Sequence, residues 1–147
     1  MEQNRDMVKE LAERALENLD RAYVPYSHFH VSAALLAEDG RVFTGVNVEN
    51  ASYPAGICAE RTAFVKAVSE GAKEFSAIAI CGGEDGHVTD YCPPCGICRQ
   101  VMREFCNPKE MTVLLAKTPE DYREMKLEDL LPLSFGPEDL PGFEGEA

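Results

Sequence analysis

The segment from Cys58 to Gly82, CAERTAFVKAVSEGAKEFSAIAICG, predicts a helix followed directly by a buried strand. The helix is expected from Cys58 to about Glu70 and to end near Gly71, because glycine commonly terminates helices. The strand, FSAIAICG, is continuously apolar, which is typical of strands covered on both faces of a sheet. A helix that leads into such a strand indicates an α/β fold.

The flanking sequence extends this pattern in both directions. Apolar residues at helical spacing predict a first helix over residues 2–23. Two apolar-rich runs around the turn residues Asp39-Gly40 predict a hairpin. The remaining expected elements are strands at 29–36, 41–48, 111–116 and 122–126 (the last an edge strand), helices at 95–105 and 127–132, and an irregular tail after Pro132. This order predicts a mixed sheet covered by helices, an α/β sandwich.

Composition limits the possible functions. The 147 residues suit one domain, 1–147, and folding at that size buries roughly 70% of the unfolded surface. A net charge of −12 disfavours nucleic acid and anionic membranes as partners. The N-terminal residues lack a long apolar core, so we expect neither a signal peptide nor a membrane span, and a cytoplasmic location.

Three of the six cysteines have the spacing of metal ligands. Clustered cysteines in a reducing compartment indicate metal binding or catalysis rather than disulfides. Cys95 and Cys98 lie at i and i+3 of a predicted helix start, and Cys58 heads another helix. Helix N-termini carry a partial positive charge that favours thiolate. Three thiolates on one Zn²⁺ leave a coordination position open, which is the pattern of catalytic zinc.

The two residues that follow Cys58-Ala59 complete this hypothesis. A carboxylate at Glu60 can move protons between water and a leaving group beside the metal. Three thiolates on Zn²⁺ give a net charge of −1, which weakens the ion as a Lewis acid. The guanidinium of Arg61 can offset that charge by hydrogen bonding to the sulfurs.

The other cysteines leave alternatives open. Cys81 and Cys106 are read as small buried hydrophobes. Cys92 makes a C-x₂-C-x₂-C run that resembles the start of an iron–sulfur pattern, but Met102 stands where the fourth cysteine belongs. Cys92 can also complete a closed, structural Cys₄ zinc site. We read it as a neighbour of the site, not a ligand.

Motifs along nearly the whole chain resemble the small, homotetrameric cytidine deaminases. The zinc deaminase signature, a Cys or His followed by x-E and later by P-C-x-x-C, is present as CAE and PCGIC. The segments AYVPYSHFHVSAALL, GVNVENASYP and LEDLLPLSF add to the match. The resemblance implies a three-layer α/β/α sandwich around a mixed five-stranded sheet, and a homotetramer with shared active sites.

The resemblance also assigns roles to residues. It implies that Cys58, Cys95 and Cys98 bind Zn²⁺, one ion per subunit, that Glu60 carries protons, and that Arg61 bonds to the ligand sulfurs. For the substrate, it implies sugar binding by Asn47 and Glu49, and further pocket residues at Phe29, Ala59 and Phe135, the last reaching a neighbouring subunit.

The implied reaction is hydrolytic deamination of cytidine and deoxycytidine to uridine and deoxyuridine, as in pyrimidine salvage. Glu60 takes a proton from the attacking water and returns it to the substrate. The alternatives are deamination of a cytosine-containing antibiotic such as blasticidin S, and a non-catalytic zinc or iron–sulfur module. One zinc per subunit in a colourless protein favours the hydrolase over an iron–sulfur module.

Overall fold

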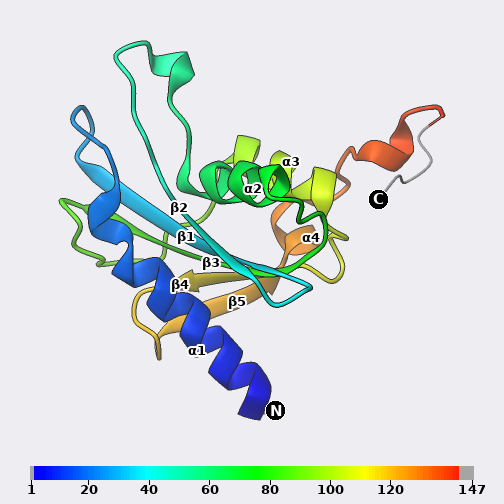
Figure 1. The fold of residues 1–147 in the computed structure, drawn as a ribbon, viewed down its shortest axis with the longest axis horizontal. Coiled ribbons are helices and arrows are strands. Elements are labelled where there is room, and N and C mark those ends of the chain that lie inside the picture. The colour runs from blue at the N-terminus through cyan, green and yellow to red at the C-terminus, as the bar shows by residue number, and fades with distance from the viewer. Residues whose placement is uncertain (1, 143–147) are drawn as a thin grey trace.

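The computed structural model describes residues 2–142 of the chain, and five strands form one mixed sheet. The sheet order is β2-β1-β3-β4-β5 (Figure 1). β3 and β4 run parallel, and the other neighbouring pairs are antiparallel. The strands are β1 (Phe29–Ala37), β2 (Val42–Val46), β3 (Phe75–Glu84), β4 (Thr112–Ala116) and β5 (Tyr122–Lys126).

Helices cover both faces of this sheet. α1 (Glu2–Glu17) lies on one face, and α2 (Ala59–Ser69) and α3 (Gly96–Phe105) lie on the other (Figure 1). The short α4 (Leu127–Leu130) follows β5 directly. This arrangement confirms the predicted three-layer α/β/α sandwich. Within the described residues, no helix is both long and apolar enough to span a bilayer.

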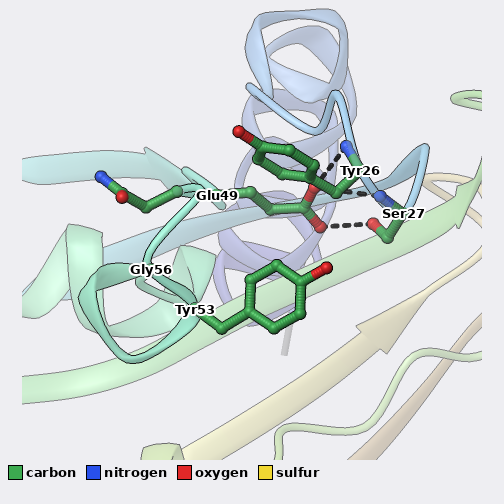
Figure 2. A pocket seen from close by; sticks show the side chains of 6 residues that line it. Tyr26, Ser27, Glu49, Tyr53 and Gly56 are labelled. Atoms are coloured by element: carbon green, nitrogen blue, oxygen red, sulfur yellow. Dashed lines mark hydrogen bonds between the residues drawn. The ribbon is translucent and has the colours of Figure 1, made fainter.

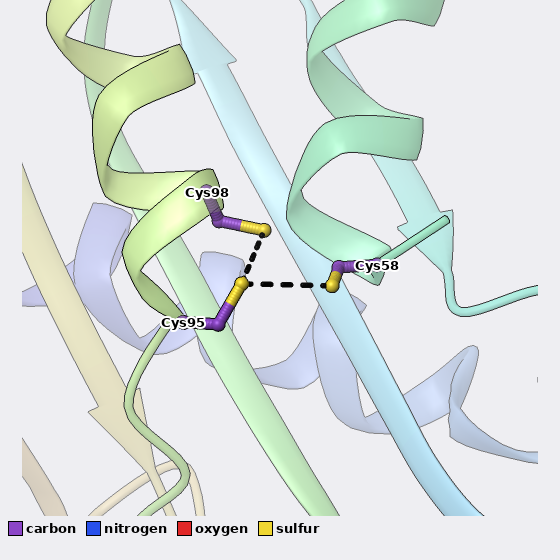
Figure 3. Close-up of side chains that lie close together, drawn as sticks. All are labelled: Cys58, Cys95 and Cys98. Carbon is purple, nitrogen blue, oxygen red and sulfur yellow. Dashed lines mark hydrogen bonds between the residues drawn. The ribbon is translucent and has the colours of Figure 1, made fainter. Parts of the chain in front are cut away.

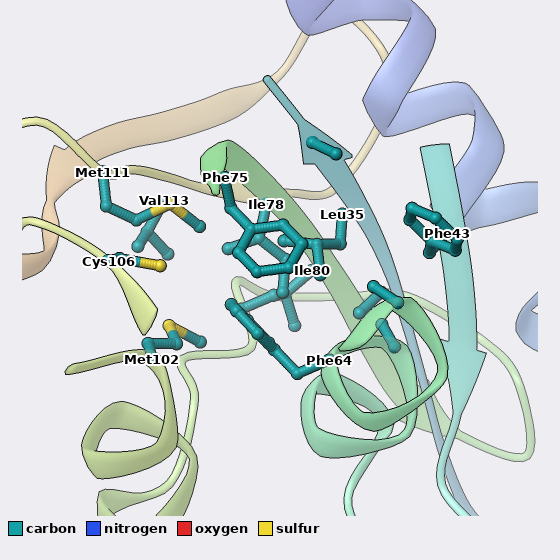
Figure 4. Packing of buried hydrophobic residues seen from close by; sticks show 14 of the residues in the cluster. Leu35, Phe43, Phe64, Phe75, Ile78, Ile80, Met102, Cys106, Met111 and Val113 are labelled. Atoms are coloured by element: carbon teal, nitrogen blue, oxygen red, sulfur yellow. The ribbon is translucent and has the colours of Figure 1, made fainter. Parts of the chain in front are cut away.

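The face of the sheet under α2 and α3 holds the larger apolar cluster (Figure 4). The Phe64 ring of α2 is fully buried and lies 5.0 Å from the Phe75 ring and 6.0 Å from the Phe105 ring, measured between centroids. Such aromatic pairs add about 0.5–1.5 kcal/mol each beyond the burial of their area. The cluster therefore fixes α2 and α3 relative to each other as well as to β3.

A glycine in β2 sets how closely α2 approaches the sheet. A Cβ atom at Gly45 would lie 2.5 Å from the Ala63 nitrogen and 2.6 Å from the Ala59 oxygen. Real Cβ atoms essentially never come so close, so any other residue here would push α2 away. Ala59 is the first residue of α2, and the contact therefore helps to place the start of that helix.

The first helix is shorter than predicted. α1 ends at Glu17, and Leu19–Arg21 form a separate 3-10 turn. The Asn18 side chain donates a hydrogen bond of 2.9 Å to the Arg14 carbonyl oxygen. Asparagine competes in this way with the backbone bonds of a continuing helix. The apolar spacing up to Tyr23 therefore overestimates the helix.

The C-terminal segment is more ordered than the predicted irregular tail. A 3-10 turn forms over Pro137–Asp139. Arg103 of α3, which is only 8% exposed, donates from Nε to Ser134 Oγ at 2.8 Å and forms an ion pair with Glu138. Gly136 lies so close to the guanidinium that a Cβ atom there would overlap it. A buried cation thus anchors the segment.

Candidate active site

The starts of α2 and α3 bring three thiols together (Figure 3). Cys58 and Cys95 are the N-cap residues of the two helices, and Cys98 lies in the first turn of α3. Their Sγ atoms all lie within 4.8 Å of one another. The Cys58–Cys95 sulfur distance is 3.8 Å, and the Cys95–Cys98 distance is 3.6 Å.

These sulfur distances fit a zinc ion. Two sulfurs bound at roughly 2.3 Å to one tetrahedral zinc are about 3.8 Å apart. Soft thiolates are also the ligands that zinc prefers. Three ligands leave one position of the tetrahedron for a non-protein ligand, which distinguishes a catalytic from a structural zinc site. Cys58, Cys95 and Cys98 therefore fit Zn²⁺ both in chemistry and in spacing.

Hydrogen bonds among the thiols and from Arg61 favour ionisation of Cys58. A hydrogen bond with Cys98 is the main cause that lowers the pKa of Cys58 to about 5, and Arg61 adds to the effect. The same hydrogen bond raises the pKa of Cys98 because the two sulfurs cannot both carry negative charge at low cost. Arg61 Nη2 lies 3.5 Å from Cys58 Sγ, as a donor to that sulfur.

Glu60 is a buried carboxyl one residue into α2. Only 4% of it is exposed, and its desolvation is the main cause that raises its pKa to about 7. The negative charge of Cys58 acts in the same direction. A buried carboxyl with no ion pair in the described structure is costly for stability, so its position is better explained by chemistry than by packing.

Cys92 lies outside the three-thiol group. Its Sγ occupies the space above Gly82 of β3, where a Cβ atom would come within 2.9 Å of the sulfur. Burial raises the pKa of this thiol to about 11. Among the described residues, the closed Cys₄ site considered from the sequence does not form, and Cys92 packs beside the site.

A pocket of about 360 Å³ opens between two loops (Figure 2). The Glu49 side chain extends from the segment after β2 toward the segment before β1. Its Oε1 accepts hydrogen bonds from the backbone nitrogens of Tyr26 and Ser27, at 3.0 and 3.1 Å. The lining residues are Tyr26, Ser27, Glu49, Asn50, Tyr53 and Gly56. Of these, only Glu49 was predicted from the sequence.

Asn47 and Phe29 are joined by a direct hydrogen bond. Asn47 Nδ2 donates to the Phe29 carbonyl oxygen at 2.8 Å, and Asn47 Oδ1 accepts from the Val31 nitrogen at 2.9 Å. The amide therefore holds the first residues of β1, and one of its two N–H groups is not used in these bonds. Phe29 is 41% exposed, so part of its ring is free to contact a ligand.

The two remaining predicted residues differ in their surroundings. Ala59 is fully buried between Cys58 and Glu60 and does not line the pocket. Phe135 does not line the pocket. It is 58% exposed on the anchored C-terminal segment, and its carbonyl oxygen accepts a 2.9 Å hydrogen bond from Gln100 of α3.

Sequence comparisons match most of the chain. The family model for the cytidine and deoxycytidylate deaminase zinc-binding region matches residues 5–115. The chain is 47% identical to a cytidine deaminase of Sporosarcina psychrophila over 133 residues, 90% of this chain and 94% of the relative. It is 42% identical to a probable cytidine deaminase of Dictyostelium discoideum over 138 residues, 93% of this chain and 89% of the relative.

Solved structures give the same result. The crystal structure of a cytidine deaminase from Burkholderia pseudomallei matches with a TM-score of 0.77 and 45% identity, over 86% of this chain and 97% of the other. The cytidine deaminase of Mycobacterium tuberculosis matches with a TM-score of 0.71 and 40% identity, over 89% and 96%.

Proposed function

Because the chain belongs to the cytidine and deoxycytidylate deaminase family, we propose that its substrates are the free nucleosides cytidine and deoxycytidine. The reaction is hydrolytic deamination, and zinc is the cofactor. The products are uridine or deoxyuridine and ammonia. The observation that carries the proposal is the three-thiol group at two helix starts with the buried Glu60 beside it.

We assign the zinc ligands to Cys58, Cys95 and Cys98, on the sulfur spacing given above. Zinc at this position supplies Lewis acidity and brings the pKa of water toward neutrality. Glu60 accepts a proton from the attacking water. Since its carboxyl is 4% exposed, the proton is held in the site and is not lost to solvent.

Glu60 then delivers protons to the base. The water oxygen bonds to C4 of cytosine while Glu60 protonates N3. Glu60 next takes the proton of the hydroxyl now on C4 and passes it to the exocyclic nitrogen, so that the C4–N bond breaks, the C4–O double bond forms and ammonia leaves. Proton transfers by one positioned group typically contribute 10²–10⁴-fold to a rate. The Arg61 guanidinium stabilises the negative charge of the Cys58 sulfur meanwhile.

The pocket residues support a nucleoside rather than a nucleotide as substrate. The six residues that line it include the carboxylate of Glu49 and neither lysine nor arginine. Hydrogen bonds from Ser27 are the main cause that keeps the pKa of Glu49 below its ordinary value, so the group is ionised at neutral pH. An ionised carboxylate accepts hydrogen bonds from sugar hydroxyls and repels phosphate. Asn47 and Phe29 complete the sugar and base contacts in this proposal.

The quaternary and cellular settings are proposals as well. A homotetramer with shared active sites would place the exposed Phe135 of one subunit against a neighbouring pocket. The net charge of −12 supports a protein that binds neither nucleic acid nor anionic membranes. We propose a cytoplasmic, single-domain enzyme of pyrimidine salvage. The similar proteins reported above are cytidine deaminases, which favours the nucleoside over the antibiotic as substrate.

The test is the loss of cytosine absorbance with cytidine or deoxycytidine, in zinc-replete and chelator-stripped protein. Turnover is expected only with zinc. The corresponding monophosphates are expected to react far more slowly, because the residues that line the pocket include no lysine or arginine to pair with a phosphate. Equal turnover of nucleoside and monophosphate would contradict the assigned pocket. Turnover that persists after complete zinc removal would contradict the assigned metal chemistry.

Glu60→Gln tests the proton carrier separately. The variant is expected to keep one zinc per subunit, because Glu60 is not among the proposed ligands, and to lose about 10²–10⁴-fold in kcat. Zinc content by atomic absorption and kcat by ultraviolet absorbance measure the two effects. Near-normal kcat with zinc bound would show that another group moves the protons.

A further inference from the structure

We propose that Ser27 is a positioning residue that orients the Glu49 carboxylate and thereby sets recognition of the sugar hydroxyls. The inference rests on the proposed sugar-binding role of Glu49. Ser27 was not predicted from the sequence, and it lines the pocket beside Glu49 (Figure 2). Three sets of contacts carry the argument.

The first set is the hydrogen bonding of the carboxylate itself. Glu49 Oε1 accepts from the Tyr26 and Ser27 backbone nitrogens, and Oε2 accepts from the Ser27 hydroxyl. An ionised carboxylate offers about four acceptor positions. Three are therefore used within the protein, and one remains, on Oε2. Since the Ser27 hydroxyl occupies the other position of Oε2, it determines where the remaining acceptor points.

The second set lies on the other side of the hydroxyl. Ser27 Oγ accepts a hydrogen bond from the Phe29 nitrogen at 3.0 Å while it donates to Glu49. One hydroxyl thus connects Glu49, the proposed sugar-binding residue, to the backbone of Phe29, a proposed pocket residue. Hydrogen bonds to charged groups are the stronger class, so this connection resists rotation of the carboxylate.

The third set shows that Ser27 does not hold its loop alone. His28 has a φ of 61°, which is uncommon for a residue other than glycine. Its nitrogen donates to the Val24 oxygen at 2.9 Å, and its oxygen accepts from the Asp85 nitrogen at 2.7 Å. Because these backbone bonds fix the turn on both sides of His28, removal of the Ser27 hydroxyl is expected to leave the loop folded.

The experiment compares cytidine with 2′,3′-dideoxycytidine, which lacks both hydroxyls of the ring. Selectivity is the ratio of kcat/KM for the two substrates. Ser27→Ala is expected to reduce this ratio about tenfold, the scale of one hydrogen bond to a charged group. The loss is expected mainly in the KM for cytidine, because a sugar contact is made equally in ground and transition states. Ser27→Thr keeps a hydroxyl and is expected to restore the ratio.

Three further variants make the test specific: Glu49→Gln, the double variant Ser27→Ala/Glu49→Gln, and Ser69→Ala. Glu49→Gln is expected to reduce the ratio, and Ser27→Ala is expected to add nothing in that background. Ser69, an exposed serine at the end of α2, serves as the matched control. If Ser27 had a purely structural role, Ser27→Ala would lower kcat/KM for both substrates equally and leave their ratio unchanged. That result, together with a reduced ratio in Glu49→Gln, would overturn the inference. An unchanged ratio in Glu49→Gln would overturn the sugar-binding role as well.

Discussion

Arg61 places a cation beside the proposed zinc ligands. Its Nη2 lies 3.5 Å from Cys58 Sγ, and the hydrogen bond with Cys58 is the main cause that raises the pKa of Arg61. Its Nε is buried without a hydrogen-bond partner among the described residues. A buried donor without a partner costs desolvation free energy, which a surface arginine would avoid by keeping its nitrogens in water. This cost supports a role of Arg61 in hydrogen bonding to the ligand sulfurs.

Replacement of this arginine is expected to weaken the site. Arg61→Ala should lose zinc to a chelator at about 10–100-fold lower chelator concentration, the usual effect of removing a partner of a metal ligand. Arg61→Lys keeps the charge but lacks the planar guanidinium, so its zinc retention is expected to lie between those of wild type and Arg61→Ala. Chelator competition monitored by a zinc-sensitive dye measures this, with the exposed Arg5→Ala as control. Wild-type zinc retention in Arg61→Ala would contradict the role.

Single residues differ in how far the sequence could predict them. The pairs Cys58–Glu60 and Cys95–Cys98 follow from short spacings at helix starts, whereas the approach of Cys58 to Cys95 depends on how two separate helices pack. Tyr26, Ser27 and Tyr53 could not be predicted, because their site role depends on contacts between distant segments. The bond between Ser27 and Glu49, for example, joins residues 22 positions apart.

At the level of elements, periodicity predicts the types of the helices and strands well and their ends less well. The edge strand Tyr122–Lys126 has the bounds expected from its composition. α1 ends six residues early because a single side chain, Asn18, bonds back to the helix. The C-terminal anchor could not be predicted, since nothing local shows that Arg103 is buried or that Glu138 reaches it.

The anchor between α3 and the C-terminal segment should depend on pH. The Arg103 hydrogen bond is the main cause that holds the pKa of Glu138 below its ordinary value of 4.5. A carboxyl whose pKa is lowered by folding stabilises the fold above its ordinary pKa. That contribution is lost as pH falls through the lowered value.

Glu138→Gln is therefore expected to lower Tm at pH 7. The Tm difference from wild type should close as pH falls through the lowered pKa of Glu138, which lies below the ordinary value of 4.5, because the wild-type carboxyl is then protonated as well. The effect is expected to be modest because Glu138 is exposed. Thermal melts from pH 3 to 8 measure it, with Glu128→Gln, an exposed glutamate of α4, as control. A Tm difference that does not vary with pH would show that the ion pair is not the cause.

At the level of the whole molecule, the shared active sites proposed above would let two defective variants complement each other. A Glu60→Gln subunit still presents Phe135, and a Phe135→Ala subunit still carries Glu60. If Phe135 acts in a neighbouring pocket, co-expressed tetramers should contain some complete sites. Their kcat/KM is then expected to exceed the mean of the two separate variants several-fold. The control is co-expression of Glu60→Gln with Cys58→Ser, because one subunit supplies both of these residues to the same site. An activity no higher than the mean would place Phe135 in its own subunit's site or in none.

The proposed ligands Cys58 and Cys95 lie 37 residues apart, at the starts of helices that are separated in the chain by β3. β3 is the central strand of the sheet. An ion held by both thiols closes a loop through the middle of the protein, much as a disulfide would, and reduces the freedom of the unfolded chain. Zinc is then a removable cross-link, and its supply is expected to govern how long each enzyme molecule survives in the cell as well as how fast it works.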